Sequence, residues 1–116
     1  MVVDQISDVE VDRLFHALAD ATRRDIVRRV LDGEQSISEL ARRYPMSMTA
    51  VQKHVAVLEG AGLVTKHRQG REQRILGRSE ALENARRLLD EFEKVWRSRF
   101  DRIGGLLAEE IEGGRT

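Results

Sequence analysis

The sequence predicts a mainly α-helical domain with one small β-hairpin, and three observations support this. Apolar residues recur at helical spacing along most of the chain, and several of these runs follow a serine or aspartate that can cap a helix. One segment around Gly70 instead has the pattern of two short strands joined by a turn. The 116 residues are enough for one modest core, and aliphatic residues far outnumber aromatic ones.

The expected elements follow from these patterns. Residues 1–8 should form a flexible arm, residues 9–103 the folded domain, and residues 104–116 a frayed tail, because Gly104 and Gly105 each cost about 1 kcal/mol in a helix relative to alanine. Helices are expected over residues 9–19, over 21–31 after an Asp20 cap, from 37 to Pro45, from 48 to Gly60, and from a Ser79 cap to residue 103. Strands are expected over residues 63–67 and 73–76.

The middle of the chain predicts a helix-turn-helix. Ser36 and Glu39 have the spacing of a capping box, in which the hydroxyl and the carboxylate each pair with an unsatisfied backbone N–H. Pro45 ends that helix, and Ser47 caps the next one. Two short helices joined by a tight turn, the second with a polar outer face, form this motif. The basic hairpin that follows would be its wing.

Charge is unevenly distributed although the net charge is zero. Residues 1–12 contain four acidic residues and no lysine or arginine, whereas residues 42–78 contain eight lysines and arginines and only two acids. The basic block coincides with the second helix of the motif and the hairpin. A polyanionic partner explains this better than general solubility does, although a solvated charged surface remains the alternative.

Several function classes find no support. The chain has no cysteine, so disulfides, thiolate metal sites and thiol redox switches are excluded. Its three histidines lie on three separate elements and do not predict a metal site, and no catalytic triad or phosphate-binding glycine loop is present, so we expect no enzyme and no cofactor. No run is long and apolar enough for a bilayer and no signal peptide is evident, so a cytoplasmic location is expected.

The second helix of the motif has two unlike faces. Val51, Val55 and Leu58 fall on one side at about 100° per residue, and Thr49, Gln52 and Lys53 fall on the other. Amides, hydroxyls and ammonium groups form directional hydrogen bonds with base edges and phosphates, so this face is suited to a DNA groove. The alternative is an ordinary solvated helix surface. His54 flanks the apolar side, and a packed histidine and a phosphate contact remain equally open.

Four segments in register resemble the ArsR/SmtB-type winged-helix regulators: FHALADATRRDIV (residues 15–27), SISELA (36–41), MSMTAVQKHVAVLEGAGLV (46–64) and RQGREQRI (68–75). The resemblance implies a homodimeric bacterial repressor of transcription with a recognition helix in the major groove. It also implies a dimer interface built from the first and last helices. Positions 36–39 lack the paired cysteines of metal-sensing members, and the Val95-Trp96 and Phe100-Asp101-Arg102 patterns are similar to those of the metal-independent branch.

Two sets of site residues follow. The predicted DNA-binding residues lie on the two helices of the motif and on the wing: Ser36, Ser38, Ser47, Met48, Thr49, Gln52, Lys53, His54, Arg68, Arg71 and Arg74. The predicted dimer interface is apolar: Leu14, Phe15, Leu18, Leu88, Phe92, Val95, Trp96, Phe100 and Ile103. Capping alone also accounts for Ser36, and the aromatic stripe of the last helix could line a ligand pocket instead of a dimer interface.

The sequence leaves three questions open. A winged-helix module that binds an acidic protein, without specific DNA recognition, is the alternative function. A small-molecule inducer acting where the first and last helices meet would be compatible with the pattern, but no residue identifies it. The operator sequence, the target genes and autoregulation are also not encoded in any motif.

Overall fold

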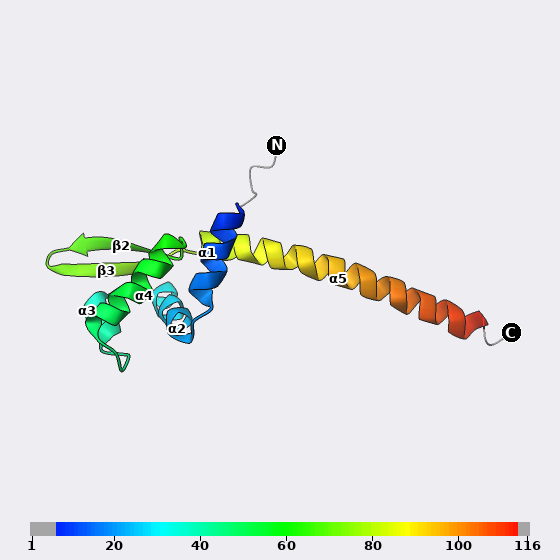
Figure 1. Ribbon diagram of the computed structural model, residues 1–116, viewed down its shortest axis with the longest axis horizontal. Helices are drawn as coiled ribbons and strands as arrows, with labels where there is room; N and C mark the ends of the chain where they lie inside the picture. Colours follow the sequence, from blue (N-terminus) through cyan, green and yellow to red (C-terminus); the bar gives the residue numbers. More distant parts are fainter. Residues whose placement is uncertain (1–6, 114–116) are drawn as a thin grey trace. The chain divides into compact units, whose positions relative to one another are not determined.

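The computed structural model of the chain describes the backbone of residues 7–113 and the side chains of residues 7–107. The elements, shown in Figure 1, are α1 (Asp8–Leu18), α2 (Ala21–Asp32), β1 (Gln35–Ser36), α3 (Ile37–Ala41), α4 (Met48–Gly60), β2 (Val64–Gln69), β3 (Glu72–Gly77) and α5 (Glu80–Gly113). The predicted winged helix-turn-helix, with its hairpin between the fourth and fifth helices, is confirmed. Within the described part of the chain, no helix is both long and apolar enough to cross a membrane.

The chain divides into two compact units, residues 1–85 and residues 86–116, and the boundary falls within α5. The first unit contains the helix-turn-helix and the sheet. Its core consists of aliphatic side chains from every helix of the unit and from the hairpin. The largest fully buried apolar residues are Leu14, Ile26, Leu40, Val51, Val55, Leu58, Leu63, Val64 and Ile75.

The sheet has one strand more than the sequence predicts. Its order is β1-β3-β2 and all pairs are antiparallel, with Gln35 opposite Ile75 and Ser36 opposite Arg74. β1 has only two residues, too few to show an alternating pattern. The two long strands are joined at Gly70 and Arg71, a shorter turn than the predicted five residues, and Gly70 has the positive φ of 65° that such a turn requires.

Side-chain caps define the starts of the first four helices, whereas at α5 the Glu83 N–H bonds to the backbone carbonyl of Ser79, the predicted cap, at 2.9 Å. The predicted caps of α2, α3 and α4 are confirmed: a side-chain oxygen of Asp20, Ser36 and Ser47 accepts a backbone N–H three residues on, at 2.9, 3.1 and 3.1 Å. A fourth cap was not predicted. The Ser7 hydroxyl accepts from the Glu10 N–H at 3.2 Å, so α1 begins at Asp8, inside the segment expected to be a flexible arm; residues 1–6 of that arm lie outside the described residues.

The capping box at α3 is only half formed. The Ser36 hydroxyl makes its predicted bond, but the Glu39 carboxylate lies 3.3 Å from the Arg74 guanidinium. Ser36 belongs to β1, where its backbone pairs with the strand that carries Arg74. Both residues of the box therefore contact β3, Ser36 through its backbone and Glu39 through its carboxylate. α3 is also short, since it ends at Ala41 and not near Pro45.

The expected end of the last helix at residue 103 is wrong. In the structure α5 continues through Gly104 and Gly105 to Gly113. Each glycine lowers helix propensity by only about 1 kcal/mol, and propagation of an existing helix adds a hydrogen bond per residue. Strong helix formers on both sides of the pair therefore allow the helix to continue.

Candidate nucleic-acid interface

The outer face of α4 is the best-defined polar surface of the first unit. Val51, Val55 and Leu58 are each 0% exposed, so the opposite side of the helix is turned to solvent. Thr49, Gln52 and Lys53 are all exposed on that side, as the sequence predicts. A hydroxyl, an amide and an ammonium group therefore project from one face of a capped helix that is held on the core by its other face.

The start of α4 adds backbone donors to this face. Ser47 and Met48 are exposed, and the first-turn N–H groups of a helix carry a partial positive charge that favours an anion. Ser38 of α3 is exposed as well. Ser36 is only 1% exposed and its hydroxyl is engaged as the cap of α3, so we remove it from the predicted contact residues.

His54 is turned toward α2 and away from the outer face. Its Nδ1 lies 3.4 Å from Arg23 Nη1 and 4.0 Å from an Asp20 carboxylate oxygen, and the side chain is 23% exposed. Of the two roles that the sequence leaves open, the structure favours packing within the fold.

The arginines of the wing differ in their surroundings. Arg68 and Arg71 are exposed, and neither takes part in an ion pair within the described residues. Arg74 lies 2.7 Å from Glu34, 3.3 Å from Glu39 and 3.2 Å from Glu72, and its side chain is 20% exposed. The hydrogen bond to Glu34 is the main reason that the pKa of Arg74 is raised. Arg74 therefore joins β3 to Glu34, the residue before β1, and to α3, and a contact with phosphate would have to displace three carboxylates.

Two further exposed basic residues lie within the helix-turn-helix and are absent from the predicted site. Arg42 and Arg43 follow α3 at the turn of the helix-turn-helix; both are exposed, and no ion pair of the described residues includes them. The signal was present in the sequence, because both are in the basic block.

Comparison with known proteins shows to which class of protein the chain belongs. The family described as "Helix-turn-helix domain" matches residues 18–67. The HTH-type transcriptional regulator Rv2034 of Mycobacterium tuberculosis is 51% identical over 53 residues, which is 46% of this chain and half of the length of Rv2034. The uncharacterized HTH-type transcriptional regulator YuzN of Bacillus subtilis is 40% identical over 80 residues, 63% of this chain and 87% of YuzN.

A solved structure matches over most of the chain. The ArsR-like transcriptional regulator from Rhodococcus sp. RHA1 is 33% identical, covers 87% of this chain and 93% of its own, and superposes with a TM-score of 0.78. The chain belongs to the ArsR family of transcriptional regulators. This ArsR-family protein is thus a DNA-binding regulator of transcription and not an enzyme, and its partner is double-stranded DNA.

The predicted dimer residues divide between core and surface. Leu14 is 1% exposed and belongs to the core of the protomer, so it is not available to a partner. Leu18 is partly buried against that core, whereas Phe15, its neighbour on α1, is 38% exposed. The regulator therefore presents Phe15, and not Leu14, on the surface of α1.

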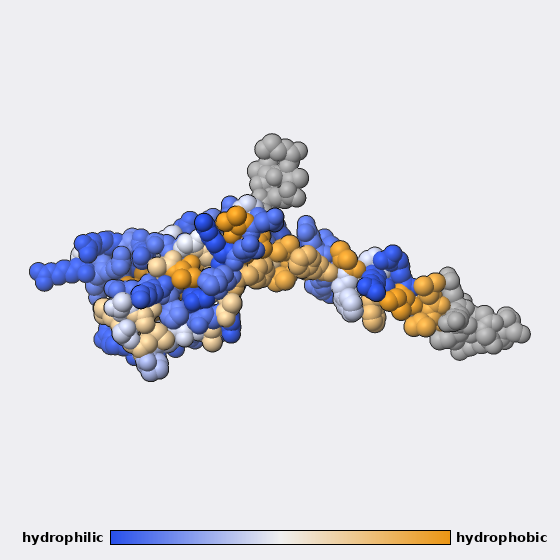
Figure 2. All heavy atoms as spheres, viewed as in Figure 1, coloured by the Kyte–Doolittle hydropathy of each residue, from blue (hydrophilic) through white to orange (hydrophobic). Residues whose placement is uncertain are grey.

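The second unit of the regulator, residues 86–116, contains the remainder of α5, which ends at Gly113 and has a largely apolar stripe. Leu88 is half-buried, and the rest of the predicted stripe is exposed: Phe92, Val95, Trp96, Phe100 and Ile103. The rings of Trp96 and Phe100 lie 6.4 Å apart. Figure 2 shows hydrophobic residues following this helix. Leu89, Leu106 and Leu107 extend the stripe beyond the residues that the sequence analysis assigned.

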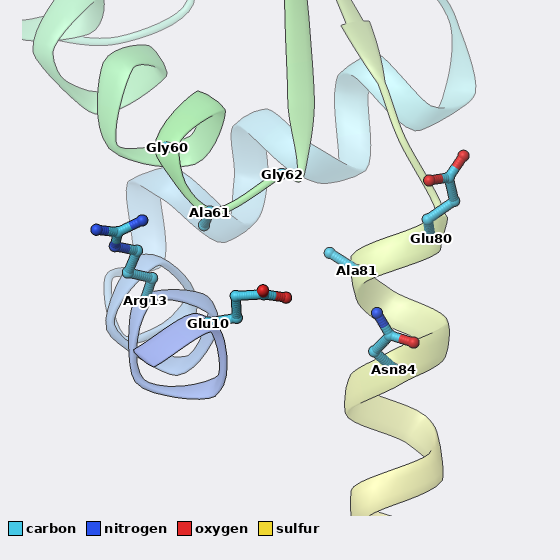
Figure 3. A pocket seen from close by; sticks show the side chains of 8 residues that line it. All are labelled: Glu10, Arg13, Gly60, Ala61, Gly62, Glu80, Ala81 and Asn84. Atoms are coloured by element: carbon cyan, nitrogen blue, oxygen red, sulfur yellow. The ribbon is translucent and has the colours of Figure 1, made fainter. Parts of the chain in front are cut away.

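A pocket of about 290 Å³ lies where α1, the end of α4 and the start of α5 meet (Figure 3). It is lined by Glu10, Arg13, Gly60, Ala61, Gly62, Glu80, Ala81 and Asn84. The lining mixes both charges with small residues, and in Figure 3 the side chain of Asn84 and the methyl group of Ala81 point toward the space. In the described part of the regulator, no group of three histidine or acidic side chains could hold a metal ion.

Proposed function

We propose that this regulator represses transcription as a homodimer that inserts α4 of each protomer into the major groove of a pseudo-palindromic operator. The observation that carries the proposal is the exposed polar face of α4, backed by a buried apolar face. In helix-turn-helix dimers the two recognition helices contact half-sites about 34 Å apart, one turn of DNA.

Individual contacts follow from side-chain chemistry. Gln52 is suited to adenine, whose N6 and N7 present a donor and an acceptor to an amide, and Lys53 is suited to guanine or to a phosphate. Arg68 and Arg71 of the wing, together with Arg42 and Arg43 at the turn, would contact the sugar-phosphate backbone. Such contacts position the protein and contribute most of the salt dependence.

The dimer itself is supported by the stripe on α5. Phe92, Trp96 and Phe100 are 60%, 62% and 64% exposed, and contiguous apolar surface of this kind marks an interaction site. A second copy of the same helix offers a matching apolar face. We therefore assign the stripe to the dimer interface, with Phe15 of α1 as a further member, and propose that the regulator works in the bacterial cytoplasm, where its operator is.

If a small molecule induces this regulator, we propose that it binds in the pocket at Glu10, Ala61 and Asn84. That pocket joins the proposed dimer helix α1 to the end of the recognition helix, so its occupation can favour one arrangement of the two. An inducer that releases DNA from the wild type but not from an Ala61→Leu variant, whose larger side chain fills the pocket, would support this placement.

A gel-shift assay on the region upstream of its own gene tests the proposal, including autoregulation. We expect a specific shift on one duplex, called the operator below, whose affinity falls steeply with salt. Gln52→Ala should weaken operator binding about tenfold and non-specific binding little, because a bidentate base contact contributes about 1–3 kcal/mol of discrimination. A protein that binds no promoter fragment specifically, or whose Gln52→Ala variant behaves like the wild type, would contradict it.

A further inference from the structure

The first turn of α2 connects two elements that the proposed function uses separately. Arg23 donates from Nε to the Ala17 carbonyl at 2.8 Å and from Nη2 to the His16 carbonyl at 2.9 Å. These carbonyls belong to the last turn of α1, where the His16 carbonyl also accepts the Ala19 N–H at 3.2 Å. Two of the guanidinium nitrogens thus hold the end of α1.

The third nitrogen faces the recognition helix. Arg23 Nη1 lies 3.4 Å from Nδ1 of His54, one residue beyond Lys53 on α4. A guanidinium can only donate hydrogen bonds, so Nδ1 of His54 is the acceptor in this contact. Asp20 completes the cluster, since its carboxylate accepts the backbone N–H of Arg23 at 2.9 Å and lies 4.0 Å from the same Nδ1.

Because His54 lies on α4, its contact with Arg23 can influence the orientation of that helix. The buried side of the helix consists of Val51, Val55 and Leu58, whose apolar contacts have little directional preference. By contrast, the strength of a hydrogen bond at the flank of the helix depends on the angle between donor and acceptor. The Arg23–His54 contact is therefore suited to fix the rotation of α4 about its own axis, and with it the direction of Gln52 and Lys53.

We propose that Arg23 is a positioning residue for DNA recognition: its guanidinium ties the end of α1 to His54 and so fixes the orientation of the recognition helix. The proposal rests on the proposed function, in which α4 contacts bases and α1 lies at the dimer interface. It gives a role to the ADATRR segment, which the DNA-contacting surface does not otherwise use. Arg23 touches no DNA in this account and acts only through His54.

The substitution Arg23→Lys tests it against a matched control. Lysine keeps the charge, but its single nitrogen cannot hold two carbonyls and the imidazole together. Arg24 is the control because it donates to the Leu18 carbonyl at 2.8 Å, also at the end of α1, but has no hydrogen bond or ion pair to α4 among the described residues. Binding is measured at a temperature at which thermal unfolding shows every variant to be folded.

We expect Arg23→Lys to weaken operator binding about tenfold, the cost of misplacing one or two base contacts, while non-specific binding stays within about twofold. Arg24→Lys should leave both affinities within about twofold of the wild type. Equal losses of operator affinity in the two variants would overturn the proposal. A loosened end of α1, without any role for His54, would then explain both losses. An equal loss on operator and non-specific DNA in Arg23→Lys, with a smaller salt slope, would overturn it in favour of a direct phosphate contact.

Substitutions at His54 supply the second measurement. His54→Ala should weaken operator binding about as much as Arg23→Lys does, and His54→Gln should restore most of it because the amide oxygen can accept from Arg23. The double variant Arg23→Lys/His54→Ala should be no weaker than the worse single variant, whereas additive losses would overturn the proposal. A wild type that does not distinguish operator from non-specific duplex overturns the proposed function as well; unchanged specificity in Arg23→Lys overturns only this proposal.

Discussion

Arginines that look alike in the sequence have different surroundings in the fold. Arg71 is exposed at the tip of the hairpin, and Arg74, three residues later, is enclosed by Glu34, Glu39 and Glu72. The first is free to approach a phosphate. Arg74 holds β3 to residues that precede the recognition helix, so its removal should lower the stability of the fold.

Replacing these two arginines by alanine should therefore have separable effects. Arg71→Ala should weaken binding to all duplexes alike and lower the salt slope by about two, one phosphate contact for each protomer, with no change in melting temperature. Arg74→Ala should lower the melting temperature, because three carboxylates lose their partner. Salt-dependent binding titrations and thermal unfolding of both variants check this; a fall in melting temperature with Arg71→Ala but not with Arg74→Ala would contradict it.

Another residue-scale cluster ties the turn of the helix-turn-helix to α2. The Tyr44 hydroxyl donates to an Asp25 carboxylate oxygen at 2.6 Å, and Arg29 Nε donates to the same oxygen at 2.8 Å. The Tyr44 bond is the main reason that the pKa of Asp25 is lowered, with Arg29 second. Burial, followed by the bond to Asp25, raises the pKa of Tyr44 to about 12.

The stability provided by Asp25 should therefore depend on pH in the acid range. Because its folded pKa is lower than its ordinary value of 3.8, the carboxylate stabilises the fold above that pH, and the contribution is lost as pH falls through the lowered pKa. The free energy of unfolding of Asp25→Asn should be below that of the wild type at pH 6, and the difference should shrink below pH 4. Urea titrations at both pH values measure it; a difference that grows in acid would refute the assignment.

At the scale of elements, the bounds of α4 are set by the residues at its two ends. Ser47 caps the start, and the chain leaves the helix after Gly60, with Gly62 at a φ of +75°. A side chain on Gly62 would meet only the Ala81 methyl group, at 3.9 Å, so the cost of a substitution there comes from the backbone and not from crowding.

Gly62→Ala should consequently destabilise the fold by about 1–2 kcal/mol, the cost of left-handed backbone for an L-residue. Gly60→Ala is the control: it is helical, a β-carbon there has nothing within 4 Å, and alanine is the better helix former by up to about 1 kcal/mol. Chemical denaturation of the two variants should give changes of opposite sign. Equal destabilisation would show that the turn does not depend on this conformation.

The sequence predicted elements where local chemistry decides the structure. Asp20, Ser36 and Ser47 cap their helices through bonds three residues along, which spacing alone reveals. β1 was missed because its two residues are strand only through pairing with β3. For the same reason, the enclosure of Arg74 and the burial of Leu14 could not be inferred, since both depend on neighbours far away in the sequence.

At the scale of the whole molecule, the regulator has a basic surface and an apolar one. The basic block of residues 42–78 contains the recognition helix α4 and the wing, whereas the exposed apolar stripe lies on α5. A protein with one surface for DNA and another for a second copy of itself can contact two half-sites at once. The affinity for the whole operator then exceeds that of either half by the effective concentration of the second contact.

Disrupting the stripe should thus weaken DNA binding without touching the DNA surface. Trp96→Glu places a charge in the proposed interface and should convert the dimer to a monomer at micromolar concentration, with operator affinity lower by about 100-fold or more. Ser98→Glu, an exposed position outside the apolar stripe, is the control and should remain dimeric. Sedimentation equilibrium and gel shifts report the two effects; a dimer that survives Trp96→Glu would place the interface elsewhere.

Selection of binding sites from a pool of random DNA duplexes tests the central claim most directly. If two copies present α4 from one dimer, the enriched sequences should share a two-fold symmetric motif whose half-sites are centred about 10–10.5 base pairs apart. The same selection with Gln52→Ala should lose sequence preference at matching positions in both halves. Enrichment of a single unrepeated motif, or a motif unchanged by Gln52→Ala, would contradict the account.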